Sequence, residues 1–217
     1  MNYFLATIAI AVVLYVVRKA IRFRSLYPLL PRRFNFGKRR ITLRETLRLL
    51  EQRSSQTLVE TGVARNGLKH CKADGASTIV FAKWLERNTG YLYSVDINPD
   101  ATNTAKRALD ELGLSSFVNL AVSDSVAYLK EFSKPVDFLY LDSYDYDKRD
   151  QSIQKASQQH HLDEFIAIES RLHDNTVVLI DDCDLPGGGK GRTVIDYMLS
   201  RGWKIHLKAY QVLLVRS

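Results

Sequence analysis

The chain has few cysteines and histidines, the residues that form disulfide bonds and structural zinc sites. Its 217 residues include only two cysteines and five histidines. Cys71 and Cys183 are far apart, and no Cys/His group has zinc-finger spacing, which excludes a disulfide framework and a structural zinc site. We expect both thiols to be unbridged. No internal repeat or low-complexity segment is present, so a repeat array is also excluded.

Acidic residues are absent from the first 44 positions, which hold ten lysines and arginines. Because the whole chain has a net charge of +7, residues 45–217 carry a net charge of −3. The basic pI of about 9.4 therefore comes from the N-terminal segment and says nothing about what the rest binds. We expect no nucleic-acid partner.

Charge of either sign is absent from residues 3–17, which are mostly apolar. With Met1, Asn2 and the stems of Arg18 and Lys19, this run approaches the roughly 30 Å thickness of a bilayer core. No basic region precedes it and no small-residue cleavage site follows, which disfavours a signal peptide. The basic residues that follow predict a single-pass anchor with the remaining chain facing the cytoplasm. A core or interfacial helix is the alternative.

Three regions follow from these patterns: a transmembrane anchor over 1–20, a basic juxtamembrane linker over 21–44, and one domain over 45–217. In that domain, strand patterns and helix patterns alternate. Strands are expected at 57–61, 91–95, 117–122, 136–141, 176–180, 204–209 and 211–215, and helices at 42–53, 74–87, 99–112, 125–132, 158–172 and up to 200. The last two strands have almost no connector, so they must be antiparallel. The pattern predicts an α/β fold with a doubly wound, mostly parallel seven-stranded sheet and a C-terminal antiparallel strand.

Four of the predicted strands end in acid. Glu60, Asp96, Asp142 and the pair Asp181-Asp182 each follow or close an apolar run. The carboxyl ends of parallel strands meet at one edge of the sheet, where open α/β folds bind ligands. The sequence therefore predicts a nucleotide-type cofactor site at that edge.

The strings VETG (59–62), SVDINPD (94–100), FLYLDSYDYD (138–147) and VVLIDDCD (177–184) resemble those of class I S-adenosylmethionine-dependent methyltransferases over roughly 57–217. Within that group the chain is most similar to the metal-dependent O-methyltransferases of the catechol and macrolide-sugar types. The resemblance implies the Rossmann-like methyltransferase fold. It also implies that S-adenosylmethionine is held at its methionine part, its ribose and its adenine by Glu60, Gly62, Gly75, Ser77, Asp96, Ser123 and Asp124.

The same resemblance implies a metal site. Asp142, Asp181 and Asp182 match its acidic ligands, and oxygen-only ligands suit Mg²⁺, which would bind the acceptor oxygens. The alternative is that Asp181 or Asp182 orders the following loop without an ion. The catechol type has a lysine base three residues after the strand-four acid. Here that position is Asp145, and His160 is the other candidate for the base.

Two loops depart from common patterns. Residues 63–74 replace the tight Gly-x-Gly turn that usually follows the first strand of the family. The string GGGKGR at 187–192 lacks P-loop spacing and is expected to be a mobile lid or substrate loop, or otherwise a flexible connector.

The predicted activity is S-adenosylmethionine-dependent O-methylation of a small hydroxylated acceptor. One alternative is a membrane-tethered domain that binds this cofactor without catalysis. A nicotinamide-dependent oxidoreductase is disfavoured, because no G-x-G-x-x-G follows the first strand.

Overall fold

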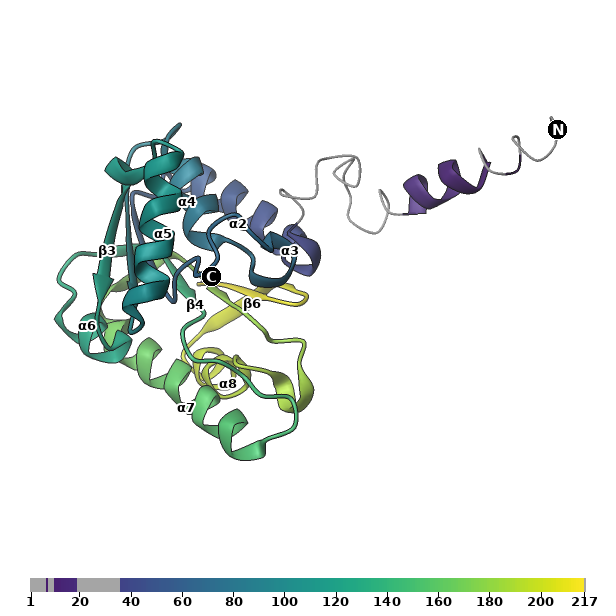
Figure 1. Cartoon of the computed structure of the whole chain (residues 1–217). Coiled ribbons are helices and arrows are strands. Elements are labelled where there is room, and N and C mark those ends of the chain that lie inside the picture. The colour runs from purple at the N-terminus through teal and green to yellow at the C-terminus, as the bar shows by residue number, and fades with distance from the viewer. Residues whose placement is uncertain (1–6, 8–9, 19–35, 217) are drawn as a thin grey trace.

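A seven-stranded sheet forms the centre of the molecule (Figure 1). The computed structural model describes residues 7, 10–18 and 36–216. In sheet order the strands are β3 (Val118–Val122), β2 (Tyr91–Asp96), β1 (Thr57–Thr61), β4 (Val136–Leu141), β5 (Leu172–Ile180), β7 (Val212–Arg216) and β6 (Trp203–Lys208).

Helices cover both faces of the sheet (Figure 1). One layer consists of α2 (Arg40–Gln52), α4 (Ser77–Leu85) and α5 (Pro99–Glu111), with the short α3 (Cys71–Asp74) beside it. The other consists of α6 (Ser125–Glu131), α7 (Gln151–Ile168) and α8 (Arg192–Ser200). Single 3-10 turns lie at η3 (Gly37–Arg39), η4 (Ser115–Phe117), η5 (Glu169–Arg171) and η6 (Pro186–Gly188).

The strand sequences produce two separate apolar cores. In β4, Phe138 and Tyr140 belong to the core beneath α2, α4 and α5, whereas Leu139 and Leu141 belong to the core beneath α6, α7 and α8. Successive side chains of a strand point to opposite faces, so a continuous apolar run is what a strand covered on both faces requires. The burial holds the polar strand ends at fixed positions.

The predicted topology is confirmed. Strands β1 to β5 pair in parallel, and β7 is antiparallel to both β5 and β6, so β7 is the reversed strand. The chain order reverses at β1, which lies between β2 and β4. Such a switch point is where open α/β sheets bind ligands.

Helix α7 begins at Gln151, seven residues before the start predicted at 158. Asp150 explains the difference, because its side chain accepts the backbone N–H groups of Ser152 and Ile153 and caps the helix. Residues 151–157 are mostly polar, which favours a loop in a prediction from sequence. His160, expected near the helix start, instead lies inside the helix.

The prediction of an N-terminal membrane anchor is wrong. Within the described ranges, no helix combines the length and the apolar character needed to cross a membrane. Residues 1–6, 8–9 and 19–20 of the predicted anchor lie outside the described residues. The cytoplasm-facing localisation rested on this anchor and is withdrawn with it.

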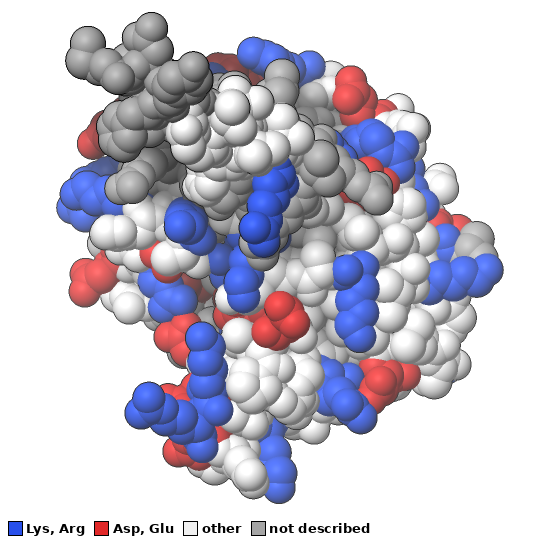
Figure 2. Space-filling view, turned by 90° about the vertical axis from the view of Figure 1, so that its right-hand side faces the viewer, with Lys and Arg blue, Asp and Glu red and all other residues white. Residues whose placement is uncertain are grey.

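Part of the predicted linker is folded. Helix α2 begins at Arg40, and Leu43 and Leu50 are buried in the core beneath it. Most of the linker, residues 21–35, lies outside the described residues, and the domain limits remain predictions. Figure 2 shows basic and acidic side chains interspersed on the face turned to the viewer.

Candidate functional site

Glu60 is fully buried at the end of β1. Its Oε2 accepts hydrogen bonds from Thr78 Oγ1 at 2.7 Å and from Ser94 Oγ at 2.6 Å. Thr78 Oγ1 also accepts the backbone N–H of Ala64 at 2.8 Å. Burial raises the pKa of Glu60 to about 7, while neighbouring hydroxyls oppose the rise. Glu60 therefore supports the loop after β1 through Thr78.

Two glycines of the predicted cofactor set allow close backbone approach. Gly62 has φ +81°, and a Cβ there would lie 2.6 Å from the carbonyl oxygen of Asp142. Gly75 has φ +84°, and a Cβ there would lie 2.8 Å from Arg39 Cδ. L side chains rarely adopt this backbone region. Gly62 thus brings the ends of β1 and β4 together, and Gly75 leaves room for Arg39.

Asp96 ends β2 beside the first loop. Its Oδ2 accepts the backbone N–H of Val63 at 3.1 Å, and its Oδ1 accepts that of Asn98 at 2.8 Å. A cavity of about 370 Å³ lies here. Its lining joins residues after β1, β2 and β4: Gly62, Val63, Arg65, Asp74, Asp96, Ile97, Asn98, Ala101, Asp142, Ser143, Tyr144 and Asp145.

Five predicted cofactor residues are not in that lining. Glu60 lies buried behind it. Gly75 and Ser77 lie just before and at the start of α4. Asp124 caps α6 by accepting the backbone N–H of Ala127 at 2.8 Å, and the hydroxyl of Ser123 donates to the Asp124 carbonyl. Contacts of these five with a cofactor stay predictions.

An ion pair spans two of the loops that line the cavity. Arg65, after β1, donates to Asp145, after β4, at 2.8 Å and 3.2 Å. Both side chains are largely exposed. Hydrogen bonds from Arg65 lower the pKa of Asp145 below its usual value, which makes this carboxylate a weak proton acceptor.

The acids predicted to bind a metal do come together. One oxygen each of Asp142, Asp181 and Asp182 lies within 4.8 Å of the others. Two cations lie among them. Arg39 binds Asp181 and Asp182 at 2.6 Å and 3.2 Å, and Lys190 binds Asp142 at 2.6 Å.

Both cations of these pairs are buried. The side chains of Arg39 and Lys190 are only 7% and 2% exposed. Burial lowers the pKa of each cation, but Asp181 and Asp142 respectively outweigh it, so both pKa values rise above their usual range. Burial raises the pKa of Asp181, and Arg39 opposes that rise. Both cations stay charged, and the donor set does not fit an additional Mg²⁺.

His160 does not line the cavity but contacts a residue that does. Its Nε2 is 3.0 Å from Ser125 Oγ and 3.3 Å from Glu164 Oε1, and its ring centroid is 5.3 Å from that of Tyr144, which lines the cavity. Glu164 is buried and also accepts the hydroxyl of Ser143 at 2.6 Å. The hydrogen bond with Glu164 raises the pKa of His160.

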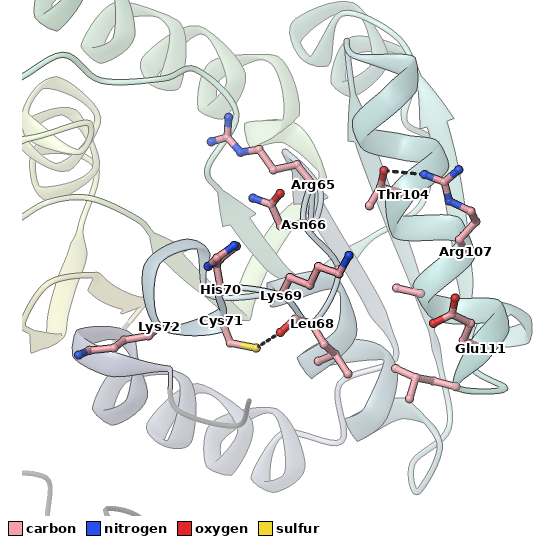
Figure 3. Close-up of a pocket in the computed structure, with 13 residues that line it drawn as sticks. Arg65, Asn66, Leu68, Lys69, His70, Cys71, Lys72, Thr104, Arg107 and Glu111 are labelled. Atoms are coloured by element: carbon pink, nitrogen blue, oxygen red, sulfur yellow. Dashed lines mark hydrogen bonds between the residues drawn. The ribbon is translucent and has the colours of Figure 1, made fainter. Parts of the chain in front are cut away.

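A larger groove of about 1320 Å³ lies between the segment 65–72 and α5 (Figure 3). This segment belongs to the loop that replaces the tight turn. Basic side chains predominate in the lining, with Arg65, Lys69, His70, Lys72 and Arg107 against the single acid Glu111. Arg65 lines both the groove and the smaller cavity, so the two are adjacent.

Sequence reasoning missed the partners of the acidic cluster. The sequence places Arg39 in the predicted linker, 142 positions away from Asp181. Lys190 belongs to the string predicted to be a mobile lid or substrate loop, or otherwise a flexible connector. The glycines on either side of Lys190 were the available signal, because they let the backbone turn sharply and pack closely.

Comparison with known proteins gives a consistent picture. The model of a family described as "Methyltransferase domain" matches residues 72–183. No curated protein matches the chain.

Solved structures share the fold at low identity. A methyltransferase from Geobacter sulfurreducens is 19% identical, with 95% of this chain and 89% of that chain covered and a TM-score of 0.56. An SAH-bound methyltransferase from Podospora anserina is 13% identical, with coverage of 82% and 78% and a TM-score of 0.59. An O-methyltransferase from Bacillus cereus in complex with SAH is 13% identical, with coverage of 81% and 80% and a TM-score of 0.55.

Proposed function

The chain belongs to the methyltransferase-domain family, whose model matches just over half of its 217 residues, and we propose that it transfers a methyl group from S-adenosylmethionine to a hydroxyl oxygen of a small acceptor. The observation that carries this proposal is the cavity at the switch point of the sheet, where Gly62, Asp96 and Asp142 meet. The SAH-bound neighbours with the same fold support the choice of cofactor.

Asp96 is the residue proposed to hold the ribose. A carboxylate has about four lone-pair sites, and two of those on Asp96 are used by Val63 and Asn98. The remaining sites suit a pair of neighbouring hydroxyls. Gly62 lets the ends of β1 and β4 lie against each other at the cavity, because a Cβ there would lie 2.6 Å from the carbonyl oxygen of Asp142. Both features are compatible with the cofactor.

S-adenosylmethionine, when bound, supplies an electrophilic methyl group. The chain has to align the acceptor and exclude water, because near-attack alignment contributes much of the rate of such a displacement. Tyr144, Ser143 and the Arg65–Asp145 pair form the side of the cavity after β1 and β4. We assign alignment of the acceptor to this side.

Of the two base candidates, Asp145 lines the cavity, whereas His160 contacts the lining residue Tyr144. We assign the base to His160 because its proton affinity is the higher of the two. Glu164 raises the pKa of His160, whereas Arg65 lowers that of Asp145. His160→Gln is expected to lower kcat by about 100-fold or more, as loss of a general base does, and Asp145→Asn to change it only a few-fold. The reverse order would identify Asp145 as the base.

Magnesium is not part of this proposal. Sequence resemblance predicted Mg²⁺ at Asp142, Asp181 and Asp182, but Arg39 and Lys190 already pair with these carboxylates.

The test is calorimetric titration of the full chain with S-adenosylmethionine, followed by product detection with a panel of small hydroxylated acceptors. One-to-one binding and transfer of the methyl group to oxygen are expected. Absence of cofactor binding would contradict the proposal. Binding without transfer to any acceptor would favour the alternative of a cofactor-binding domain without catalysis, and binding of NAD(H) instead would favour an oxidoreductase.

A further inference from the structure

The acidic cluster at the ends of β4 and β5 has a counter-charge within the chain itself. It consists of Asp142, Asp181 and Asp182, and the cations beside it are Arg39 and Lys190. Three carboxylates against two cations leave a charge of about −1, instead of the −3 that an open site of three carboxylates would offer a divalent ion.

All six carboxylate oxygens of the cluster have a partner. Arg39 Nε donates to both oxygens of Asp181 at 2.9 Å, and Arg39 Nη2 lies 3.2 Å from Oδ1 of Asp182. Lys190 Nζ lies 2.6 Å from Oδ1 of Asp142 and 3.5 Å from Oδ2 of Asp182. The hydroxyl of Tyr140 donates to Oδ2 of Asp142 at 3.2 Å. A metal ion would have to displace these donors.

Displacement would leave two buried cations unpaired. The side chains of Arg39 and Lys190 are 7% and 2% exposed, so neither reaches bulk water without rearrangement of the loops. Breaking a buried ion pair by removing one partner is strongly unfavourable, because the other charge is left without compensation.

The backbone is shaped around both cations. A Cβ at Gly75 would lie 2.8 Å from Arg39 Cδ, and one at Gly189 would lie 1.8 Å from the carbonyl oxygen of Asp182. The tight turn at Gly189 carries Lys190, whose backbone N–H donates to that same carbonyl at 3.2 Å. These glycine positions are evidence for built-in cation sites that is independent of the ion-pair distances.

The two cations also join the chain segments that a metal ion bound by all three carboxylates would join. Lys190 joins Asp142 after β4 to Asp182 after β5. Arg39 joins Asp181 to the segment before α4, because its Nη1 donates to the carbonyl of Ala73, and its guanidinium lies 4.8 Å from the ring centroid of Tyr210. Four segments distant in the sequence thus meet at Arg39.

We infer that Arg39 and Lys190 take the place of a divalent ion between Asp142, Asp181 and Asp182, so that this chain binds no divalent metal there. For the proposed methyl transfer, on which this consequence rests, the acceptor oxygen is then activated without a metal. Arg39 and Lys190 act as positioning residues that hold the strand ends beside the cofactor cavity.

The test is titration of the full chain with Mn²⁺ alone, followed by electron paramagnetic resonance and by calorimetry. No saturable one-to-one binding is expected for the wild type. One-to-one binding that is lost in Asp142→Asn would overturn the inference. This readout needs neither cofactor nor acceptor, so it stands even if the proposed methyl transfer fails.

Lys190→Met tests directly whether Lys190 takes the place of a metal ion. Removing the ammonium frees oxygens of Asp142 and Asp182, and a gain of one-to-one Mn²⁺ binding is expected, with a rise in the thermal midpoint on adding Mn²⁺. Lys106→Met, an exposed lysine of α5, is the matched control and is expected to gain nothing. A folded Lys190→Met protein that takes no Mn²⁺ would contradict the role given to Lys190. If that variant does not fold, the wild-type titration still decides.

Discussion

At the scale of single residues, the strand-end acids differ in what surrounds them. Glu60 is buried among hydroxyl groups, and burial raises its pKa to about 7. Asp96 accepts two backbone N–H groups at the cavity wall. Asp142 is paired with an ammonium ion. Carboxylates at equivalent strand ends therefore serve three purposes, which the local sequence does not distinguish.

Asp96→Ala is expected to weaken S-adenosylmethionine binding by about 1–3 kcal/mol, since the ribose hydroxyls would lose their acceptor. Calorimetry on the full chain measures the change. Asp100→Ala removes an exposed carboxylate four residues later and serves as the control, with little change expected. Equal affinities for Asp96→Ala and wild type would mean that the ribose lies elsewhere.

Glu60 makes stability depend on pH. Its pKa is raised from 4.5 to about 7 in the folded chain, so between these values the folded state holds a proton that the unfolded state releases. Stability from this group therefore falls as pH rises through that window. Glu60→Gln should remove the fall, and the difference in unfolding free energy between variant and wild type should grow from about pH 4.5 to about pH 7 and then level off.

The Glu60→Gln variant has to be compared with wild type because His161 changes the pH dependence of stability in the opposite direction. Burial lowers its pKa from 6.5 to about 4, so its contribution to stability rises with pH over that range. Urea unfolding at several pH values gives both curves. Parallel curves for Glu60→Gln and wild type would show that Glu60 is not buried as described.

At the scale of elements, the glycine-rich segment after β5 is held in place by several contacts. The hydroxyl of Tyr146 donates to the carbonyl of Pro186, and Gln158 Nε2 donates to the carbonyls of Gly187 and Gly189 at 3.1 Å and 3.0 Å. Lys190 adds its ion pairs. The segment thus carries a buried cation instead of presenting one to solvent.

Gly189→Ala is expected to destabilise the fold strongly. Gly189 has φ 62° and ψ −162°, a region that is essentially limited to glycine and costs about 1–3 kcal/mol in strain, and its Cβ would lie 1.8 Å from a carbonyl oxygen. Gly113 also has a positive φ, but nothing lies within 4 Å of a Cβ placed there. Gly113→Ala therefore measures the cost of a positive φ without a steric clash. Urea unfolding should show a clearly larger loss for Gly189→Ala, and equal losses would contradict this packing.

At the scale of the whole molecule, residues 36–44 belong to the folded domain. Arg39 closes the acidic cluster, and Leu43 packs into the core beneath α2. The hydroxyl of Thr42 donates to Gln211 in the segment between β6 and β7. The N-terminal part of the described domain is therefore tied to its C-terminal hairpin and to the candidate site.

A chain that begins at residue 45 is expected to be less stable than one that begins at residue 36 by about 3 kcal/mol or more, because it leaves Asp181 buried without its partner. Urea unfolding of the two proteins measures the difference. Arg39→Met in the longer protein should reproduce much of the loss. Equal stability of the two chains would show that Arg39 is not needed to compensate Asp181.

The sequence by itself determined the sheet and the position of its acids. Apolar runs of strand length, each ended by a carboxylate, and helix signals between them were enough for the topology, because strand burial and connection handedness leave few alternatives. Helix α7 shows the limit of this approach, since Asp150 had to be recognised as a cap before its start could be placed.

Only the tertiary structure decided what the acids pair with. Arg39 lies 142 positions from Asp181, and Lys190 lies 48 positions from Asp142. Nothing local to either cation indicates its partner, because an ion pair depends on distance in space and on burial, and both arise only when the sheet and its loops pack together. The four acidic strand ends follow from the sequence, whereas the distinction between an open metal site and a cluster paired with cations follows from packing.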